Sequence, residues 1–263
     1  MTTTAPDATA RPSRTFTVRI KRQDRADSEP YWHAFTVPFK PGLNVTSVLQ
    51  AVAANPVTTD GEAVTPPTWE AACLEEVCGS CTMLVNGHVR QSCSTLIDDL
   101  LGEDNTLTLA PMTKFPVVRD LVVDRQRMFD DLKRIQGWVP IDGTHDLGPG
   151  PRESQENQEL RYALSRCMTC GCCLEACPQY TRDNDFIGPQ VFGQTLYFNL
   201  HETGKSLKAE RLREMMGPGG ITDCGNAQNC VKVCPKEVPL TEAIAQIGRQ
   251  TTTQAVKDFF SGK

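Results

Sequence analysis

Hydrophobic and polar residues alternate in the N-terminal part of the chain, which is the pattern of β-strands that bury one face. Apolar side chains stand at every second position from Phe16 to Ile20, and residues 32–37 continue the pattern after a polar turn. Two such segments joined by a polar turn predict a hairpin. Residues 106–110 alternate in the same way and are expected to close the sheet.

The pattern changes to helical spacing between and after these strands. Asn44 or Thr46 is expected to cap a helix that runs to about Ala54 and faces the sheet with its apolar residues. In the second half of the chain, apolar residues recur every three or four positions in several segments. Helices are expected at residues 125–135, from Glu156 to Cys167, from Pro189 to Leu200, before Gly217, and from a cap at Thr241 through Ile247.

These patterns predict an α+β chain of two domains. Residues 1–14 are rich in Thr, Ala, Pro and Ser and are expected to be a disordered tail, because they have nothing to bury. Residues 15–114 would form a small domain of strands and one helix, and residues 115–263 would form a helical domain. Gly148-Pro149-Gly150-Pro151 is expected to be a break or linker within the helical part.

Composition limits the cellular compartments and the kinds of partner that are compatible with these domains. The chain has 263 residues, twelve cysteines and a formal net charge of -5. An acidic balance argues against nucleic-acid binding, which needs a basic face. No apolar signal segment opens the chain and no run approaches the length of a membrane span. We therefore expect reduced thiols, and any membrane contact to be made through a partner.

Five of the cysteines stand in one short segment, four of them at ferredoxin spacing. Cys167, Cys170, Cys173 and Cys177 form the run C-x2-C-x2-C-x3-C, and a proline follows. In bacterial ferredoxins three thiolates of such a run bind one 4Fe-4S cluster and the fourth binds a second cluster. A structural zinc site needs only four ligands in total, so iron-sulfur is the better interpretation than zinc or a disulfide framework. Cys172 lies outside the pattern and is expected to be a spectator thiol.

The same spacing returns near the C-terminus with one substitution. Cys224, Cys230 and Cys234 repeat it, while Ala227 occupies the second ligand position and cannot bind iron. The crossover rule assigns four thiolates to a 4Fe-4S cluster, those of Cys167, Cys170, Cys173 and Cys234. Three thiolates remain for the other cluster, those of Cys177, Cys224 and Cys230. Three ligands suit a 3Fe-4S cluster.

A third group of cysteines lies in the first domain. Cys73, Cys78, Cys81 and Cys93 have the C-x4-C-x2-C spacing, with a fourth cysteine after eleven residues, that is typical of plant-type 2Fe-2S proteins. Asn86-Gly87 predicts the hairpin that returns the fourth ligand. A Rieske centre would need two histidines in this group, whereas His88 alone lies nearby. We therefore expect a plant-type 2Fe-2S ferredoxin domain of the β-grasp kind, followed by an all-α, bacterial-ferredoxin-like domain with two clusters.

No substrate site accompanies the three expected clusters. The sequence has no Gly-rich dinucleotide fingerprint, no Ser-His-Asp arrangement and no HExxH motif. The chain is therefore interpreted as an electron-transfer subunit without catalytic residues of its own. It would carry single electrons from a partner that holds the substrate to a partner that takes the electrons away.

The order and spacing of these motifs closely resemble the iron-sulfur subunits of succinate dehydrogenase and fumarate reductase. Besides the ligands, the resemblance includes Val77-Cys78-Gly79-Ser80-Cys81, Pro116-Val117-Val118-Arg119-Asp120-Leu121, Phe186-Ile187-Gly188-Pro189 and Asn229-Cys230. It implies a flavoprotein partner with covalent FAD that oxidises succinate and feeds the 2Fe-2S cluster. Electrons would then pass through 4Fe-4S and 3Fe-4S to a quinone at a membrane anchor, on the cytoplasmic face of a bacterial cell membrane. Fumarate reduction in the opposite direction is the alternative.

Other segments resemble the subgroup found in Bacillus, in which one anchor subunit carries two haems b and the acceptor is menaquinone. These segments are Cys73-Leu74-Glu75-Glu76-Val77-Cys78, Pro140-Ile141-Asp142-Gly143, Asp146-Leu147-Gly148-Pro149-Gly150-Pro151 and Asp223-Cys224-Gly225-Asn226. Ubiquinone-reducing members are similar but have a Trp and a His near the quinone, where this chain has Arg182 and Gly225. Quinone contacts from this chain would come from Pro178, Gln179 and Arg182, and the alternative for these residues is a solvent-exposed loop.

Two other classes of protein compete with this interpretation. A two-cluster subunit of the glycolate-oxidase or heterodisulfide-reductase type would carry four ligands in both ferredoxin blocks, and Ala227 argues against it. A freely diffusing ferredoxin would not need the long helical part that follows the first domain.

Overall fold

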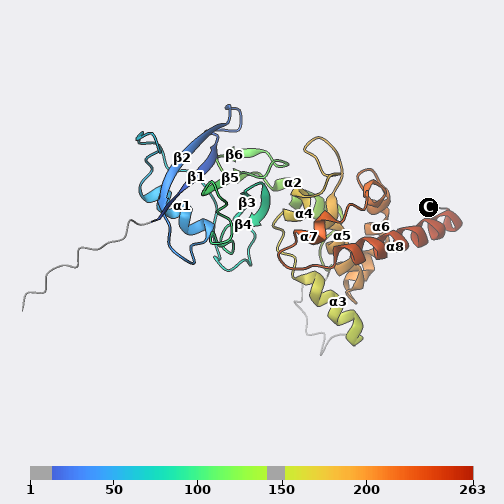
Figure 1. Ribbon diagram of the computed structural model, residues 1–263. Coiled ribbons are helices and arrows are strands. Elements are labelled where there is room, and N and C mark those ends of the chain that lie inside the picture. Colours follow the sequence, from blue (N-terminus) through green and yellow to red (C-terminus); the bar gives the residue numbers. More distant parts are fainter. Residues whose placement is uncertain (1–13, 141–151, 263) are drawn as a thin grey trace, which may run out of the picture.

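The computed structural model describes residues 14–140 and 152–262, which form two lobes (Figure 1). The expected tail, apart from Arg14, and the expected linker at residues 148–151 lie outside the described residues. The first lobe is built from β1 (Thr15–Arg22), β2 (Tyr31–Pro38), α1 (Val45–Ala54), β3 (Thr82–Val85), β4 (His88–Gln91) and β5 (Thr106–Ala110). Strands and helix follow the order that the sequence predicts.

The five strands form one mixed sheet in the order β2-β1-β5-β3-β4. β1 pairs antiparallel with β2 and parallel with β5, and β3 pairs antiparallel with both β4 and β5. The expectation that residues 106–110 close the sheet is wrong in one respect, because β5 is the central strand. Leu107 and Leu109 are fully buried because β5 has neighbours on both sides.

Helix α1 packs its apolar face into the core of the first lobe. It begins after Asn44, whose side-chain oxygen accepts a hydrogen bond from the backbone N–H of Ser47 at 2.8 Å. Such a cap satisfies one of the N–H groups that a helix start leaves without a partner. Val48 and Leu49 are fully buried in the same cluster as the strand residues.

A short hairpin that the sequence did not reveal connects the lobes. It consists of β6 (Val117–Arg119) and β7 (Val122–Val123), with Asp120 in the turn at a positive φ of 46°. The buried Asp120 carboxylate accepts hydrogen bonds from Arg22 Nε at 2.8 Å and from the backbone N–H of Thr68 at 2.8 Å. An unpaired buried carboxylate would be strongly destabilising, so Asp120 needs these partners in the first lobe. The ion pair with Arg22 and the hydrogen bond from Thr68 therefore hold the turn against that lobe.

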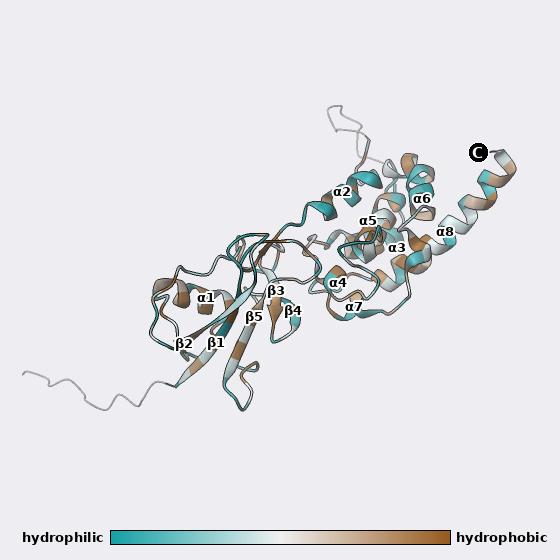
Figure 2. Ribbon diagram, turned by 90° about the horizontal axis from the view of Figure 1, so that it is seen from above, coloured by the Kyte–Doolittle hydropathy of each residue, from teal (hydrophilic) through white to brown (hydrophobic). Residues whose placement is uncertain are grey.

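The second lobe is helical. It contains α2 (Gln126–Arg134), α3 (Gln155–Ser165), α4 (Cys172–Glu175), α5 (Gly188–Leu200), α6 (Lys208–Met216), α7 (Asn229–Lys232) and α8 (Leu240–Ser261), with 3-10 turns η1 (Gly204–Leu207) and η2 (Ile221–Asp223). α5 lies centrally and packs against α3, α4 and α8. Its predicted stripe residues Phe192 and Leu196 are fully buried in the core. Figures 1 and 2 both show α8 extending beyond the other helices.

The predicted cap of the last helix is wrong. α8 begins at Leu240, so Thr241 lies inside its first turn, and no side chain caps it. The carbonyl oxygen of Pro239 instead accepts the first helical hydrogen bond, from the N–H of Ala243 at 3.0 Å. Within the described ranges, none of the helices combines the length and the apolar character that a membrane span requires.

Side chains of the second lobe hold the segment that leaves the first lobe. The Glu175 carboxylate of α4 accepts hydrogen bonds from the backbone N–H groups of Thr113 at 2.9 Å and Lys114 at 3.1 Å. Arg182 donates to the carbonyl oxygens of Thr113 at 2.9 Å and Phe115 at 2.7 Å. Carboxylate and guanidinium groups make strong, directional hydrogen bonds, so these contacts fix the relative position of the lobes.

Candidate iron-sulfur centres

The first group of cysteines lies at the end of the sheet. Cys73 and Cys78 belong to the loop that precedes β3, Cys81 immediately precedes β3, and Cys93 follows β4. The Sγ atoms of Cys81 and Cys93 are 3.5 Å apart, and both side chains are buried. The β3–β4 hairpin that returns Cys93 turns at Asn86-Gly87, both at positive φ, as the type I′ turn requires.

The loop around Cys73 presents backbone donors to sulfur. The N–H groups of Glu75, Val77 and Cys78 donate to Cys73 Sγ at 3.4, 3.3 and 3.4 Å. Leu74 and Glu76 have positive φ values of 61° and 55°, a curled backbone that turns several N–H groups toward one point. Donors of this kind stabilise a thiolate, and thiolates are the ligands of iron-sulfur clusters. The loop therefore fits a cluster.

The hydroxyl of Ser80 supports a second thiolate in the same loop. Ser80 Oγ lies 3.1 Å from Cys78 Sγ, and its hydrogen bond lowers the pKa of Cys78 to about 6. Burial has the opposite effect on the far side of the site, where it raises the pKa of Cys93 to about 11. Metal binding would have to displace the proton of Cys93, because only the thiolate is a ligand.

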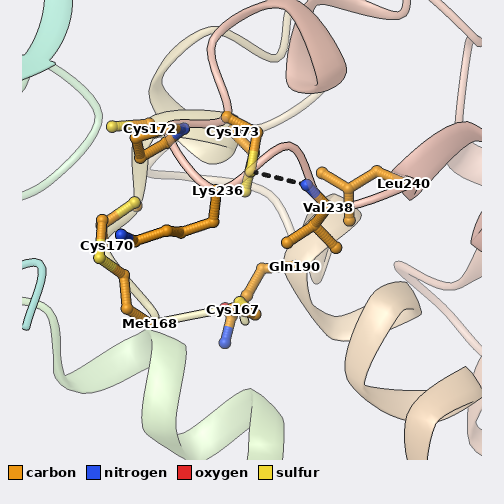
Figure 3. Close-up of a pocket in the computed structure, with 12 residues that line it drawn as sticks. Cys167, Met168, Cys170, Cys172, Cys173, Gln190, Lys236, Val238 and Leu240 are labelled. Carbon is orange, nitrogen blue, oxygen red and sulfur yellow. Dashed lines mark hydrogen bonds between the residues drawn. The ribbon is translucent and has the colours of Figure 1, made fainter. Parts of the chain in front are cut away.

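The second group surrounds one cavity of the helical lobe (Figure 3). Five cysteines line it, the four predicted ligands Cys167, Cys170, Cys173 and Cys234 and also Cys172, which the sequence placed outside the ligand pattern. Cys167 and Cys170 follow α3, Cys173 lies in α4, and Cys234 follows α7. The N–H of Val238 donates to Cys234 Sγ at 3.4 Å, which is the dashed line in Figure 3. Burial raises the pKa of Cys173 well above its ordinary value.

A glutamine amide in this cavity has no partner in the protein. Gln190 of α5 lines the cavity and is 2% exposed. In the part of the chain that the structure describes, neither its Nε2 nor its Oε1 atom makes a hydrogen bond. Buried polar groups are nearly always paired, so this amide is expected to meet a polar group that fills the cavity. The residues therefore fit a cluster with sulfur atoms at its surface.

The third group surrounds a separate cavity. Cys177, Cys224 and Cys230 line it together with Ala227. The structure thus brings together the cysteines that the crossover rule grouped, and it places the Ala227 methyl at the wall where a fourth ligand would stand. Such a site offers iron three thiolates.

The residues expected near a quinone lie in two places. Pro178 and Gln179 line the third cavity. Arg182 does not, because its guanidinium donates to the carbonyl oxygens of Thr113 and Phe115. Gly225 packs against Gln179, since a Cβ on Gly225 would lie 2.5 Å from Gln179 Nε2.

The loop of the first site contacts a cysteine of the second site. The sequence did not predict which residues make this contact. Gly79 of the first loop has a φ of +73°, and a Cβ there would lie 2.8 Å from Cys170 Cβ. Arg125 holds this loop by donating to the carbonyl oxygens of Gly79 at 2.7 Å and Ser80 at 3.1 Å. No local pattern could reveal Arg125, because its partners lie more than 40 positions away and depend on how the lobes dock.

Cys172, expected to be a spectator, lies at the same junction. Its thiol is buried and accepts a hydrogen bond from Gln91 Nε2 at 3.4 Å. Gln91 Oε1 in turn lies 3.4 Å from Cys81 Sγ. The Cys172 thiol also hydrogen-bonds Cys170 and so lowers the pKa of Cys170 to about 7. A chain of polar contacts thus joins a cysteine of the first site to a cysteine of the second.

The second and third sites are neighbours as well. The short helix α4 carries Cys173 of the second site and ends just before Cys177 of the third. At the start of α5, Gln190 lines the second cavity and Pro189 lines the third. Three cysteine sites therefore follow one another through the molecule. Iron-sulfur clusters bound at such a series of sites would let electrons move in single steps.

Comparison with known families defines the class of protein. A model described as a 2Fe-2S iron-sulfur cluster binding domain matches residues 17–130, and one described as a 4Fe-4S dicluster domain matches residues 163–238. The chain is therefore an iron-sulfur protein that combines these two domains. The mixed sheet and the helices of the two lobes agree with this class.

Individual relatives define the family. The chain is 54% identical over 241 residues to the succinate dehydrogenase iron-sulfur subunit of Bacillus subtilis, covering 92% of this chain and 94% of that protein. It is 28% identical over 242 residues to the fumarate reductase iron-sulfur subunit of Wolinella succinogenes, covering 90% and 97%. The chain belongs to the family of succinate dehydrogenase and fumarate reductase iron-sulfur subunits, so the resemblance seen in its motifs is confirmed.

A solved structure shows the same fold. A chain of the Mycobacterium smegmatis Sdh1 complex in the apo form matches with a TM-score of 0.76 and 24% identity, covering 92% of this chain and 97% of that chain. The agreement spans both lobes, since so little of this chain is left out. Their arrangement is therefore shared with a solved relative.

Proposed function

We propose that this chain is the electron-transfer subunit of a succinate:quinone oxidoreductase, the complex II of respiration and the citric acid cycle. Electrons enter from a flavoprotein with FAD and leave toward a membrane anchor. The observation that carries the proposal is the series of three adjoining cysteine sites in a chain 54% identical to a succinate dehydrogenase iron-sulfur subunit. The bound clusters would supply one-electron redox chemistry.

The protein's own residues hold these centres. Cys73, Cys78, Cys81 and Cys93 would bind the 2Fe-2S cluster, and the backbone donors around Cys73 would stabilise its negative charge. Cys167, Cys170, Cys173 and Cys234 would bind the 4Fe-4S cluster in the second cavity. Cys177, Cys224 and Cys230 would bind a 3Fe-4S cluster beside Ala227. Cys173 in the second cavity and Cys177 and Cys230 in the third are buried, whereas Cys78 of the first site is exposed.

The finer architecture is part of the same proposal. The sheet with α1 packed on it is a plant-type ferredoxin domain of the β-grasp kind, spanning residues 15–114. Residues 115–263 are the bacterial-ferredoxin-like domain. Because Met112 and Phe115 pack in the core of the helical lobe while Leu121 packs in that of the first, the connection is shared by both.

The partners follow from the subgroup that the sequence resembles. The anchor is one cytochrome b subunit with two haems, the acceptor is menaquinone, and the chain lies on the cytoplasmic face of the cell membrane. Pro178 and Gln179 at the third cavity would face the anchor. The guanidinium of Arg182 is held by backbone carbonyls, so a quinone contact from this residue would need it to leave them.

A pair of adjacent cysteines tests the cluster assignment. Cys173→Ser removes a proposed ligand, and we expect the purified complex to lose the 4Fe-4S signal and much of its iron. Cys172→Ser is the matched control, because it changes the neighbouring thiol, which is not a proposed ligand, and we expect the iron content to stay that of the unaltered protein. Equal iron loss in both variants would contradict the assignment.

Purification of the complex from membranes tests the partners and the direction. With an affinity tag on this chain, we expect a flavoprotein and a subunit whose haem b absorbance changes when succinate is added. A complex without haem would contradict the proposed anchor. Clusters that fumarate oxidises readily but succinate fails to reduce would establish the alternative, fumarate reduction. The fumarate reductase relative is more distant, at 28% identity, which favours succinate oxidation.

A further inference from the structure

The side-chain amide of Gln190 is buried at the second site without a hydrogen-bond partner, and the ligand assignments do not explain it. The side chain is 2% exposed, and neither of its polar atoms has a partner among the described residues. Leaving a buried amide unpaired is unfavourable, because its polar atoms lose their hydrogen bonds to water and gain none in the protein. A leucine or methionine would fill the same space without this cost. The amide therefore needs a partner that the polypeptide does not provide.

The amide belongs to a residue that lines the cavity of the second site. Gln190 lines it with five cysteines, four of them the proposed ligands, and with Lys236 (Figure 3). Apart from thiols, Gln190 and Lys236 carry the side-chain hydrogen-bond donors among the described residues of this lining. The remaining wall consists of apolar side chains and backbone. A cluster in this cavity would present sulfur atoms that accept hydrogen bonds but cannot donate them.

The backbone holds Gln190 at this position. Gly188 begins α5 at a φ of +82°, and a Cβ there would lie 2.1 Å from Leu174 Cδ2. α5 therefore starts in direct contact with α4, the helix that carries Cys173. Pro189 then faces the third cavity and Gln190 the second. The first turn of α5 therefore lies between the second and third sites. The N-terminus of this helix, which is the positive end of its dipole, is next to both.

We propose that Gln190 donates a hydrogen bond from Nε2 to a sulfur atom of the 4Fe-4S cluster and thereby raises the potential of that cluster. This inference rests on the proposed 4Fe-4S site. Reduction adds negative charge to the cluster, and an N–H donor stabilises the more negative state. Gln190 is therefore a positioning residue for the middle electron-transfer step, because its amide stabilises the reduced form of the 4Fe-4S cluster.

Replacement of the amide tests the proposal through a potential. In the assembled complex, Gln190→Met keeps the length of the side chain and removes both polar atoms. We expect the midpoint potential of the 4Fe-4S cluster, measured by redox titration with electron paramagnetic resonance, to become more negative while that of the 2Fe-2S cluster stays unchanged. Gln246→Met is the matched control, because Gln246 of α8 bonds Glu242 and does not line the cavity. An unchanged 4Fe-4S potential at full cluster occupancy in Gln190→Met would overturn the proposal.

A second measurement does not depend on the Gln190→Met variant assembling its cluster. The complex is prepared with ¹⁵N in glutamine side-chain amides, and the reduced 4Fe-4S cluster is studied by pulsed electron paramagnetic resonance. Gln194 also hydrogen-bonds Cys167, so the sample carries Gln194→Met to remove that amide. We expect a ¹⁵N coupling from the Gln190 amide in this sample, and its absence would overturn the proposal. Both measurements reduce the cluster chemically and do not need succinate. The Gln190 proposal can therefore be wrong while succinate still reduces the clusters. It can also be right if the complex works as a fumarate reductase.

Discussion

Gly79 lets the first two sites approach each other. Its φ of +73° favours glycine, and an added Cβ would lie 2.8 Å from Cys170 Cβ and 2.9 Å from Cys170 Cα. Real Cβ atoms do not approach backbone this closely, so any larger residue must push the two loops apart. We therefore expect the rate of electron transfer between the first two clusters to depend on the absence of a side chain at Gly79.

Gly79→Ala should slow this transfer. We expect a later reduction of the 4Fe-4S cluster after rapid mixing with reductant, followed by freeze-quench spectroscopy, and a loss of stability of at least 1–2 kcal/mol, roughly the cost of the left-handed backbone. Gly87→Ala is the control, because Gly87 has a similar φ of +78° but no atom within 4 Å of an added Cβ. Equal slowing in both variants would mean that backbone strain, and not the loop contact, is responsible.

Ala227 is the residue on which the proposed iron content of the third site depends. Its methyl lines the cavity with three cysteines, at the second position of the repeated ferredoxin spacing. The spacing together with the crossover rule of bacterial ferredoxins predicted this grouping. Gln190, Gln91 and Arg125 could not be predicted in this way, because their roles depend on residues that folding brings to them.

Ala227→Cys should convert the third cluster. We expect a fourth thiolate to admit a fourth iron, so the signal of an oxidised 3Fe-4S cluster should disappear and the iron content should rise by about one atom per chain. The cluster potential should fall, and quinone reduction should slow with it. Ala227→Ser is the size-matched control, since a hydroxyl is a poor iron ligand. Iron content that does not change in Ala227→Cys would contradict the ligand assignment.

Helix α1 joins local folding to the first cluster site through its cap. Asn44 Oδ1 accepts from the N–H of Ser47 at 2.8 Å, and Asn44 Nδ2 donates to the carbonyl oxygen of Cys93 at 2.9 Å. The cap was predictable from a residue type that commonly begins helices. The contact with Cys93 was not, because it spans 49 positions. One side chain thus stabilises both an element and a ligand loop.

Two substitutions at Asn44 should separate these roles. Asn44→Asp keeps the cap oxygen and loses the donor, whereas Asn44→Ala loses both. We expect Asn44→Ala to lower the free energy of unfolding of the first lobe by about 1 kcal/mol more than Asn44→Asp does. Both should increase the loss of 2Fe-2S absorbance to an iron chelator. A 2Fe-2S cluster as resistant in Asn44→Asp as in the unaltered chain would show that the Cys93 contact is unimportant.

The hairpin of β6 and β7 could not be predicted from the pattern of hydrophobic and polar residues. Residues 117–123 form only five strand positions, too short for a periodic signal. Asp120 is held there by Arg22, 98 positions away. The same limit applies to β5, whose alternation predicted a strand but not its central place. Pairing partners in a mixed sheet are set by packing and not by local periodicity.

The two lobes are held together by polar groups as well as by the core. Glu175 accepts from Thr113 N, Thr113 Oγ1 and Lys114 N at 2.9, 2.6 and 3.1 Å. Its carboxylate is buried and therefore needs all three donors. Because α4 also carries Cys173, this contact ties the middle cluster site to the segment that leaves the first lobe.

Glu175→Gln should loosen this docking. The amide keeps one acceptor oxygen and sets an N–H against backbone donors, so we expect a loss of about 1–3 kcal/mol in stability. Limited proteolysis should cut the segment near Thr113 sooner. Glu103→Gln, in an exposed loop of the first lobe, should leave both measurements within about 0.5 kcal/mol of the unaltered chain. Unchanged proteolysis of Glu175→Gln would show that the apolar core alone holds the lobes.

Electron paramagnetic resonance of the membrane-extracted complex tests the whole arrangement most directly. The sample is oxidised with air, measured, then reduced with succinate and measured again. The account predicts a 3Fe-4S signal in the oxidised sample that disappears on reduction, and a 2Fe-2S signal that appears with succinate. A complex without the oxidised signal would contradict the three-ligand site beside Ala227, and the series of 2Fe-2S, 4Fe-4S and 3Fe-4S clusters with it.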